Sequence, residues 1–376
     1  MLIYTVKPGD TVSAIARTFQ IPISTIIYNN QLPYPYQLAV GQALLLSAEG
    51  SDARPVIDAA GYAYPYANES VLRQTLPYMT ALNIFSYGFT VEGELIPPRQ
   101  SDERLIFLAN TYGARPVMTL TPIDASGTFN NNLISGLVHN PASVAHLIDE
   151  IIQRLEESGM QGVDVDFEYI LPEDRVAFAD FVRELRIAVN AIGYRVSVAL
   201  APKVSDNQPG LLYEGKDYAL LGAAADFVLL MTYEWGYTYS VPMAVAPVNK
   251  VRQVVDYALT RIPAGKIHLG IPNYGYDWPL PHIAGVTKAT SIGNLAAVQI
   301  AIENNAEIQF DETAQSPWFT YTKDGVQHEV WFEDVRSYQA KFGLITEYGL
   351  AGAGFWQLMR PNLPGWLLMS GTFWIR

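Results

Sequence analysis

The segment GVDVDFEYI (residues 162–170) alternates acidic with apolar side chains in a run that otherwise has the composition of a buried strand. Successive side chains of a strand point to opposite faces, so Asp164, Asp166 and Glu168 are expected to share one face. Three carboxylates on a buried face cannot all be ionised cheaply, and at least one is expected to hold its proton near neutral pH. A carboxylic acid of that kind suits general acid catalysis.

Short apolar runs alternate with longer amphipathic stretches on both sides of this segment. Between the runs, apolar residues recur at spacings of three and four, which is typical of helices that bury one face. The runs that we interpret as strands are residues 56–64, 82–89, 115–122, 162–170, 194–202, 226–235, 267–276 and 350–358. Eight strands alternating with helices predict an α/β fold, a (β/α)8 TIM barrel with its catalytic groups at the C-terminal ends of the strands.

Two further units are predicted outside the eight-strand pattern. Residues 1–47 have the order strand, helix, helix, strand, and polar residues 48–54 are interpreted as a linker to a barrel domain at 55–376. The long gap between the seventh and eighth strands contains hairpin-like sequence with KDG as its turn. We therefore expect a small α+β insertion at about residues 279–332.

The composition limits the classes of function. The chain has 376 residues, 49% of them hydrophobic, and a formal net charge of −13, which argues against nucleic acid or an anionic membrane as a partner. It has no cysteine, and its histidines show no metal-ligand spacing, so neither a metal nor a cofactor is expected. The sequence starts without the basic and apolar regions of a signal peptide, and we expect a monomer.

The first 47 residues resemble a LysM domain. The resemblance implies a module that binds glycans containing N-acetylglucosamine. It rests on spaced positions that agree together: Tyr4, Val6, Gly9–Thr11, Ile15–Ala16, Asn29 and Gly41–Gln42.

The stretch QGVDVDFE (161–168) is similar to the fourth-strand signature DGxDxDxE of family 18 glycoside hydrolases, the chitinase-like family. That resemblance implies a retaining hydrolase in which the 2-acetamido oxygen of the substrate attacks the anomeric carbon. By position, Glu168 would be the acid/base, and Asp166 would orient the acetamido group and stabilise the intermediate. Asp164 would hydrogen-bond Asp166. Gln161 replaces the first Asp of the signature, with little catalytic loss expected.

Other segments match the same family in the expected order. In MTYEW (231–235), the resemblance makes Tyr233 a hydrogen-bond donor to the acetamido group, and in GAGFWQL (352–358) it makes Trp356 the floor of the sugar subsite. Glu234 stands where the family usually has Asp, so it is either a sugar contact or a rim carboxylate. Further candidates to line the substrate groove are Tyr274, Tyr276, Trp278 and Tyr87, although aromatic residues after a strand are as often packing residues.

The combination of LysM, linker and barrel most resembles the spore cortex-lytic peptidoglycan N-acetylglucosaminidases. We therefore interpret the chain as a retaining endo-β-N-acetylglucosaminidase of peptidoglycan, associated with the spore or cell wall or extracellular. One alternative is a chitinase that acts on chitin oligomers. Another is a non-catalytic glycan-binding or spore-coat protein, which would not need Glu168.

Overall fold

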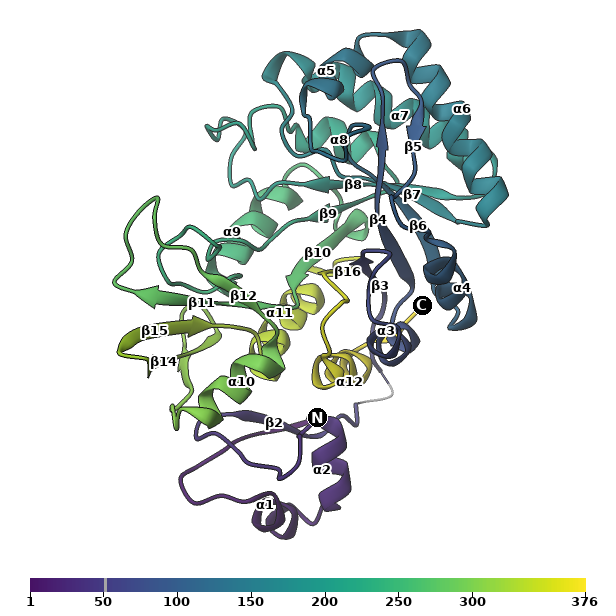
Figure 1. The fold of residues 1–376 in the computed structure, drawn as a ribbon. Coiled ribbons are helices and arrows are strands. Elements are labelled where there is room, and N and C mark those ends of the chain that lie inside the picture. Colours follow the sequence, from purple (N-terminus) through teal and green to yellow (C-terminus); the bar gives the residue numbers. More distant parts are fainter. Residues whose placement is uncertain (51–52) are drawn as a thin grey trace.

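The structure, a computed structural model, describes residues 1–50 and 53–376. A small N-terminal module lies at one end of a larger domain, and the insertion lies beside both (Figure 1). Of the predicted linker, residues 51–52 fall outside the described residues.

The N-terminal module has the predicted order of elements. It consists of β1 (Leu2–Thr5), α1 (Val12–Phe19), α2 (Ile23–Asn29) and β2 (Ala43–Ser47), and the two strands pair antiparallel. Thr11 caps α1, because its Oγ1 accepts a hydrogen bond from the Ala14 amide at 3.1 Å. Ile15, Ile26 and Leu44 are buried in a small core of the module's own.

The larger domain is a closed barrel of eight parallel strands, which confirms the predicted fold. Each strand pairs with its neighbours in chain order, and the first strand pairs with both the second and the last, so the sheet closes. The barrel strands are β3 (Val56–Ala63), β4 (Ala81–Phe89), β6 (Arg115–Leu120), β7 (Gly162–Val165), β8 (Arg195–Leu200), β9 (Phe227–Leu230), β10 (Ile267–Pro272) and β16 (Gly352–Trp356).

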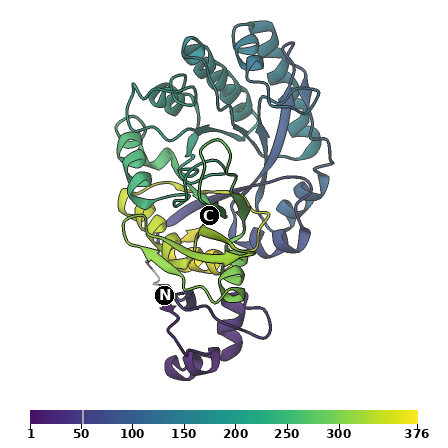
Figure 2. The same cartoon turned by 60° about the vertical axis from the view of Figure 1, so that its left-hand side comes forward.

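Helices cover the outside of the strands (Figure 2). The longest, α6, begins after Asn140, whose side chain accepts from the Ala142 and Ser143 amides, and ends at Gly159 with a left-handed backbone. The barrel helices are α3 (Glu69–Thr75), α4 (Glu103–Thr111), α5 (Asn132–Val138), α6 (Pro141–Ser158), α7 (Arg175–Ala191), α8 (Tyr218–Ala224), α9 (Val248–Leu259), α11 (Val335–Tyr348) and α12 (Leu363–Thr372). Short elements complete the domain: 3-10 turns at Leu76–Tyr78, Pro172–Asp174 and Ala264–Lys266, and strands β5 (Leu95–Ile96) and β17 (Trp374–Ile375).

The insertion follows the seventh barrel strand, as predicted, but it begins at Gly275 rather than near residue 279. Its five strands form an antiparallel sheet in the order β12-β11-β15-β14-β13, with one helix. The elements are β11 (Gly275–Leu280), β12 (Thr290–Ile292), α10 (Asn294–Glu303), β13 (Gln309–Asp311), β14 (Ser316–Lys323) and β15 (Val326–Trp331).

The fourth barrel strand is shorter than the 162–170 run predicts. β7 ends at Val165, and the next amide, that of Asp166, makes a last hydrogen bond to the Leu120 carbonyl at 2.9 Å. Phe167 then packs outward against two rings of α7, Phe178 and Phe181, at centroid distances of 5.5 and 5.9 Å. The acids therefore lie at the point where the chain leaves the barrel mouth.

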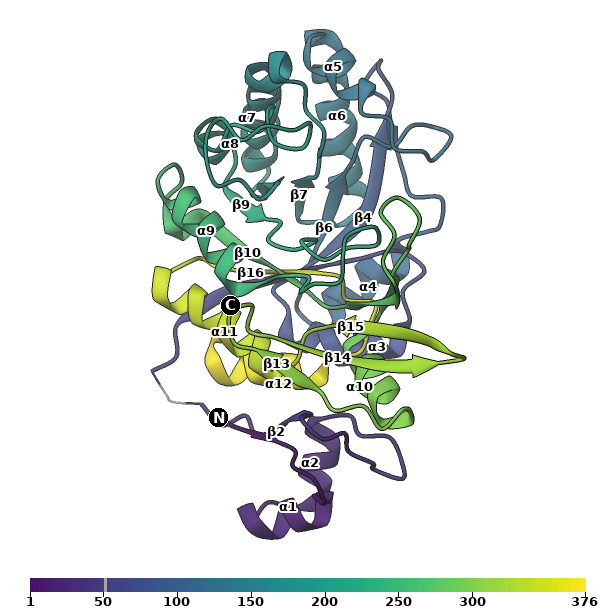
Figure 3. The ribbon, with the colours of Figure 1, turned by 90° about the vertical axis from the view of Figure 1, so that its left-hand side faces the viewer.

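The N-terminal module packs against the insertion (Figure 3). The Ile308 amide of the insertion donates to the Val40 carbonyl at 2.9 Å, and Arg336 Nη2, on barrel helix α11, donates to the Gly41 carbonyl at 3.2 Å. Ala39 belongs to the insertion's own hydrophobic core, beside residues of α10. The module is therefore held by hydrogen bonds and packing contacts as well as by the linker.

We predict that Gly41→Ala separates the module from the insertion and that Gly9→Ala does not. Both glycines have left-handed backbones, with φ of 81° and 83°, so either alanine costs about 1 kcal/mol or more. Only at position 41 would the new Cβ lie 1.8 Å from the Ile308 carbonyl oxygen, whereas nothing lies within 4 Å at position 9. Chemical unfolding should show an additional loss of about 1–3 kcal/mol for Gly41→Ala, with faster proteolysis near residues 48–54. Equal losses would mean that this contact does not hold the module.

Candidate active site

The three predicted acids meet at the C-terminal mouth of the barrel. Asp164 is the third residue of β7, Asp166 follows the strand, and Glu168 lies two residues further along. Glu168 lines two cavities, one of about 460 Å³ shared with Tyr233 and Glu234, and one of about 230 Å³ shared with Asp166. The expected cluster of carboxylates is therefore present, and two of its members, Asp166 and Glu168, line cavities that a ligand could enter.

Asp164 is the deepest of the three and is fully hydrogen-bonded. Its Oδ2 accepts from the Tyr62 hydroxyl at 2.8 Å, and its Oδ1 accepts from the Ser197 hydroxyl at 2.5 Å. Burial raises its pKa, and these two hydrogen bonds oppose the rise. Asp164 therefore takes its hydrogen bonds from strands β3 and β8.

Asp166 has a different environment. Its Oδ1 is buried without a hydrogen-bond partner among the described residues. Burial and the neighbouring charges of Glu168 and Asp164 raise its pKa well above the usual range. The pKa of Glu168 is also raised by burial. A buried polar atom without a partner is rare, and Asp166 also lines the cavity of about 230 Å³, where a ligand could supply the missing donor.

Lys216, which lies in the loop between β8 and α8, is not predicted as a site residue from the sequence. This side chain is fully buried, and its Nζ donates to the Ala199 carbonyl at 2.8 Å. Burial lowers its pKa to about 8, and the charges of Asp166, Glu168 and Asp164 oppose that effect. The segment GLLYEGKDY around it carries no pattern that distinguishes this lysine from an exposed one.

Tyr62 and Ser197 were also missed, although a signal for them exists. Each is a residue with a hydroxyl group in a barrel strand that is otherwise largely apolar, VIDAAGYA for β3 and RVSVAL for β8. A buried hydroxyl requires a partner, and here both hydroxyls find Asp164.

Tyr233 and Glu234 follow the sixth barrel strand and line the larger cavity. Burial, together with the charges of Asp166 and Glu168, raises the pKa of Tyr233 well above its usual range, so the hydroxyl keeps its proton. Glu234 accepts hydrogen bonds from the Tyr274 hydroxyl at 2.5 Å and the Tyr276 hydroxyl at 3.1 Å. These two buried tyrosines therefore hold Glu234, and Glu234 itself faces the cavity.

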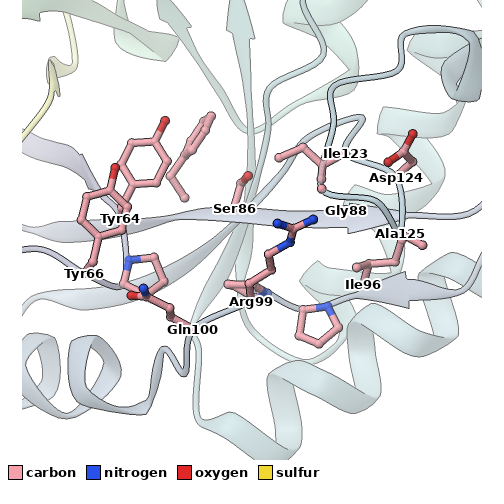
Figure 4. Close-up of a pocket in the computed structure, with 15 residues that line it drawn as sticks. Tyr64, Tyr66, Ser86, Gly88, Ile96, Arg99, Gln100, Ile123, Asp124 and Ala125 are labelled. Carbon is pink, nitrogen blue, oxygen red and sulfur yellow. The ribbon is translucent and has the colours of Figure 1, made fainter.

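Trp356, the last residue of β16, contacts Tyr62, which is a hydrogen-bond partner of Asp164. The two rings lie 5.6 Å apart, and Tyr62 in turn donates to Asp164. Trp356 also contacts Phe85 at 5.0 Å, which lines a further cavity of about 320 Å³. Tyr64 and Tyr66 lie side by side at one end of that cavity, with Arg99 near its middle (Figure 4).

Two predicted groove residues lie elsewhere. Tyr87 is fully buried on the helix side of β4, where its hydroxyl donates to Asp102 and accepts from Arg154 Nε. The pairing of β4 with β6 shifts register between Phe85 and Tyr87, which changes the face that Tyr87 occupies. Trp278 is fully buried in β11, and its Nε1 donates to the Ser240 carbonyl at 2.8 Å.

Among the described residues, no group of three His, Cys, Asp or Glu side chains is arranged to hold a metal ion. Of the helices that the structure describes, none is long and apolar enough to cross a lipid bilayer.

Comparison with known proteins gives consistent matches. The profile of the glycosyl hydrolases family 18 matches residues 125–360, and that of the LysM domain matches residues 4–47. The chain is 36% identical to the cortical fragment-lytic enzyme of Bacillus subtilis (strain 168), over 99% of this chain and 98% of the relative. It is 32% identical to the putative sporulation-specific glycosylase YdhD of the same organism, over 100% of this chain and 89% of the relative.

Among solved structures, the spore cortex-lytic enzyme SleL of Bacillus megaterium QM B1551 superposes with a TM-score of 0.94 and 31% identity. That match covers 100% of this chain and 98% of the other.

We predict that Asp166→Asn stabilises the folded protein at neutral pH. The native carboxyl has a raised pKa, so its charge disfavours folding at pH values above the unfolded pKa of about 4. The amide removes that cost, for a gain of about 1 kcal/mol or more at pH 7 that fades as the pH falls toward 4. Denaturant unfolding between pH 4 and pH 8 measures it.

Asp164→Asn is the control for this prediction. The pKa of Asp164 is raised as well, but both of its oxygens accept hydrogen bonds. An amide nitrogen cannot accept, so the lost hydrogen bond should cancel or exceed the gain from removing the charge. Equal behaviour of the two variants would contradict the distinction between a partnered and an unpartnered carboxylate.

Proposed function

The chain belongs to glycosyl hydrolase family 18 and carries an N-terminal LysM domain, and we propose that it is a retaining endo-β-N-acetylglucosaminidase of peptidoglycan. It is a glycoside hydrolase, and its spore cortex-lytic relatives support peptidoglycan as the polymer. The observation that carries the finer proposal is the cavity-lining pair of Asp166 and Glu168, both with raised pKa, next to Tyr233.

In the proposed mechanism, the Glu168 carboxyl gives its proton to the glycosidic oxygen as the bond to the anomeric carbon breaks. The carbonyl oxygen of the substrate's own 2-acetamido group attacks that carbon and forms a cyclic oxazolinium ion. The Glu168 carboxylate then takes a proton from water, the water oxygen opens the ring, and the configuration is retained.

Asp166 and Tyr233 would act on the acetamido group during this sequence. The unpartnered Oδ1 of Asp166 is suited to accept the acetamido N–H and to balance the positive charge of the intermediate. The Tyr233 hydroxyl, which keeps its proton, is suited to donate to the acetamido oxygen. Trp356 would offer its ring to the C–H face of the sugar, and Glu234 would accept a hydroxyl further along the groove.

We propose the spore cortex as the peptidoglycan involved, because relatives that match nearly the whole chain are named for cortex lysis. A spore or cell-wall location follows from that substrate. A chitinase remains the alternative, since chitin also carries the 2-acetamido group on which the mechanism depends.

The LysM domain is proposed to hold the same glycan at a second place. A cavity of about 540 Å³ is lined by residues 10–13 and 35–38 of the module and by Ile302 and Asn305 of the insertion. The catalytic domain therefore contributes a wall to this cavity. A polymer bound there would raise the concentration of substrate near the barrel mouth.

We predict that Glu168→Gln lowers kcat by about 10²-fold to 10⁴-fold, because the amide has no acidic proton to transfer. The assay is digestion of cortex peptidoglycan and of chitin oligomers, with mass analysis of the fragments. New reducing N-acetylglucosamine ends from peptidoglycan support the proposal. Turnover of chitin alone would establish the chitinase, and no turnover of either would refute both proposed substrates. Full activity of the variant would refute the mechanism, as would indifference to a thiazoline analogue of the intermediate.

We predict that Asn305→Gly weakens binding of N-acetylglucosamine oligomers at the LysM cavity about 2-fold to 10-fold, the effect of losing one hydrogen bond. Glycine keeps the left-handed backbone of this residue, whose φ is 49°. Calorimetry on full-length Glu168→Gln protein, with its barrel site filled by the thiazoline, isolates this cavity. Asn304→Gly is the matched control, because Asn304 bonds to the Ile300 carbonyl and does not line the cavity. If both variants bind as the parent does, the insertion takes no part.

A further inference from the structure

The cavity of about 320 Å³ has no role in the mechanism above. It lies between the segment after β3, strand β4 and the loops that follow β5 and β6. Phe85 lines this cavity and Phe129 lines the smaller cavity of the acids, and their two rings lie 6.5 Å apart. The two cavities are therefore neighbours at the barrel mouth, and a polymer chain is long enough to occupy both.

Aromatic rings lead from Trp356, where a sugar is proposed to bind, into this cavity. The Tyr64 ring lies 6.2 Å from that of Trp356 and stacks on the Tyr66 ring at 5.1 Å, with 23° between the two planes. Tyr66 is 59% exposed, so its ring is open to a ligand. Rings of this kind suit the C–H faces of a sugar, and this pair would direct a glycan toward the middle of the cavity.

The middle of the cavity holds a cation (Figure 4). The Arg99 side chain is exposed, and its Nη2 donates to the Ser126 carbonyl. Arg99 forms no ion pair with a carboxylate of the residues that the structure describes. The guanidinium therefore keeps most of its N–H donors for a ligand.

One acid is found among the described residues that line this cavity, and its bonds are local. Asp124 Oδ1 accepts from the Ser126 amide at 2.9 Å and from the Thr128 amide at 3.2 Å. The chain as a whole has a formal net charge of −13, which disfavours the approach of an anionic polymer. An arginine without an ion pair is therefore a local exception, at a place where a polymer could pass.

Carboxylates are the groups that distinguish peptidoglycan from chitin. Both polymers carry N-acetylated sugars, but chitin is uncharged, whereas peptidoglycan has carboxylates on the lactyl groups of its muramoyl sugars or on the peptides attached there. A guanidinium presents a planar fork of donors that matches a carboxylate.

We propose that Arg99 binds a carboxylate of the peptidoglycan strand while the Tyr64 and Tyr66 rings support the adjoining sugar, so that this cavity selects the anionic polymer over chitin. The inference rests on the proposed function for the identity of the polymer. It rests on the position and contacts of Arg99 for the existence of the site.

The first test is the ratio of kcat/KM for peptidoglycan fragments to kcat/KM for chitin oligomers. Arg99→Gln should lower this ratio about 3-fold to 30-fold, the range between an exposed ion pair and a charge-assisted hydrogen bond. Methyl esterification of the carboxylates should lower the ratio for the parent by a similar factor and should not lower it further for Arg99→Gln. Losses that add independently would show that Arg99 does not act on the carboxylate.

Arg186→Gln is the matched control, because it removes the same charge from a distant place. Arg186, on α7, also donates to one main-chain oxygen, that of Ala223, and it does not line the cavity. We expect this variant to keep the ratio of the parent. An equal fall in both variants, or an unchanged ratio in Arg99→Gln, overturns the proposal.

A binding measurement on full-length Glu168→Gln protein identifies which carboxylate is bound. Calorimetry compares glycan strands that keep their peptides with the same strands after an amidase has removed the peptides, which frees the lactyl carboxylate. Addition of Arg99→Gln should weaken the binding of at least one of the two. Loss with the first alone assigns a carboxylate of the peptide, and loss with the second assigns that of the lactyl group.

The same measurement needs no turnover and separates this inference from the proposed function. No weakening with either strand refutes the carboxylate site, even if the parent hydrolyses peptidoglycan. Weakened binding supports the site even if the parent turns over chitin alone, a result that would refute the proposed function instead.

Discussion

Three carboxylates are forced together at the mouth of a closed barrel, and much of the local structure answers to that constraint. Closure of the sheet removes water from one face of β7, so each charge there is costly. Asp164 is accommodated by two hydroxyl donors, from β3 and β8. Asp166 is left with a buried oxygen that nothing satisfies, and a lysine with no access to solvent stands nearby. Buried polar groups without partners are expected at functional sites, where a ligand can supply the missing hydrogen bond.

Glu234 stands where the family usually has Asp, and its surroundings show how the longer side chain is accommodated. Its backbone is left-handed, with φ of 66°, a rare conformation for a residue other than glycine, asparagine or aspartate. Two buried tyrosines of the β10–β11 segment hold its carboxylate at the edge of the larger cavity. The aromatic residues that the sequence suggested as sugar platforms thus act one layer below the surface of the groove.

The features that could be predicted are those with a local period. Alternation placed the acids on one face, and recurring apolar runs gave eight strands, the barrel and the insertion. The features that could not be predicted depend on distant contacts. A register shift between β4 and β6 turned Tyr87 away from the groove. The fourth strand ends at Val165, although Phe167 beyond it still packs outward on α7. Lys216 reaches the acids from a loop whose sequence contains no sign of its burial.

The seating of the LysM domain on the insertion has a consequence for action on a solid substrate. A catalytic domain joined to its binding module by a flexible linker alone can reach every bond within the length of that linker. Here the Ile308–Val40 hydrogen bond and the packing of Ala39 fix the position of the cavity proposed to bind glycan relative to the insertion of the barrel domain. If both cavities hold glycan, the fixed distance between them would determine which glycosidic bonds of a polymer sheet can reach the barrel mouth.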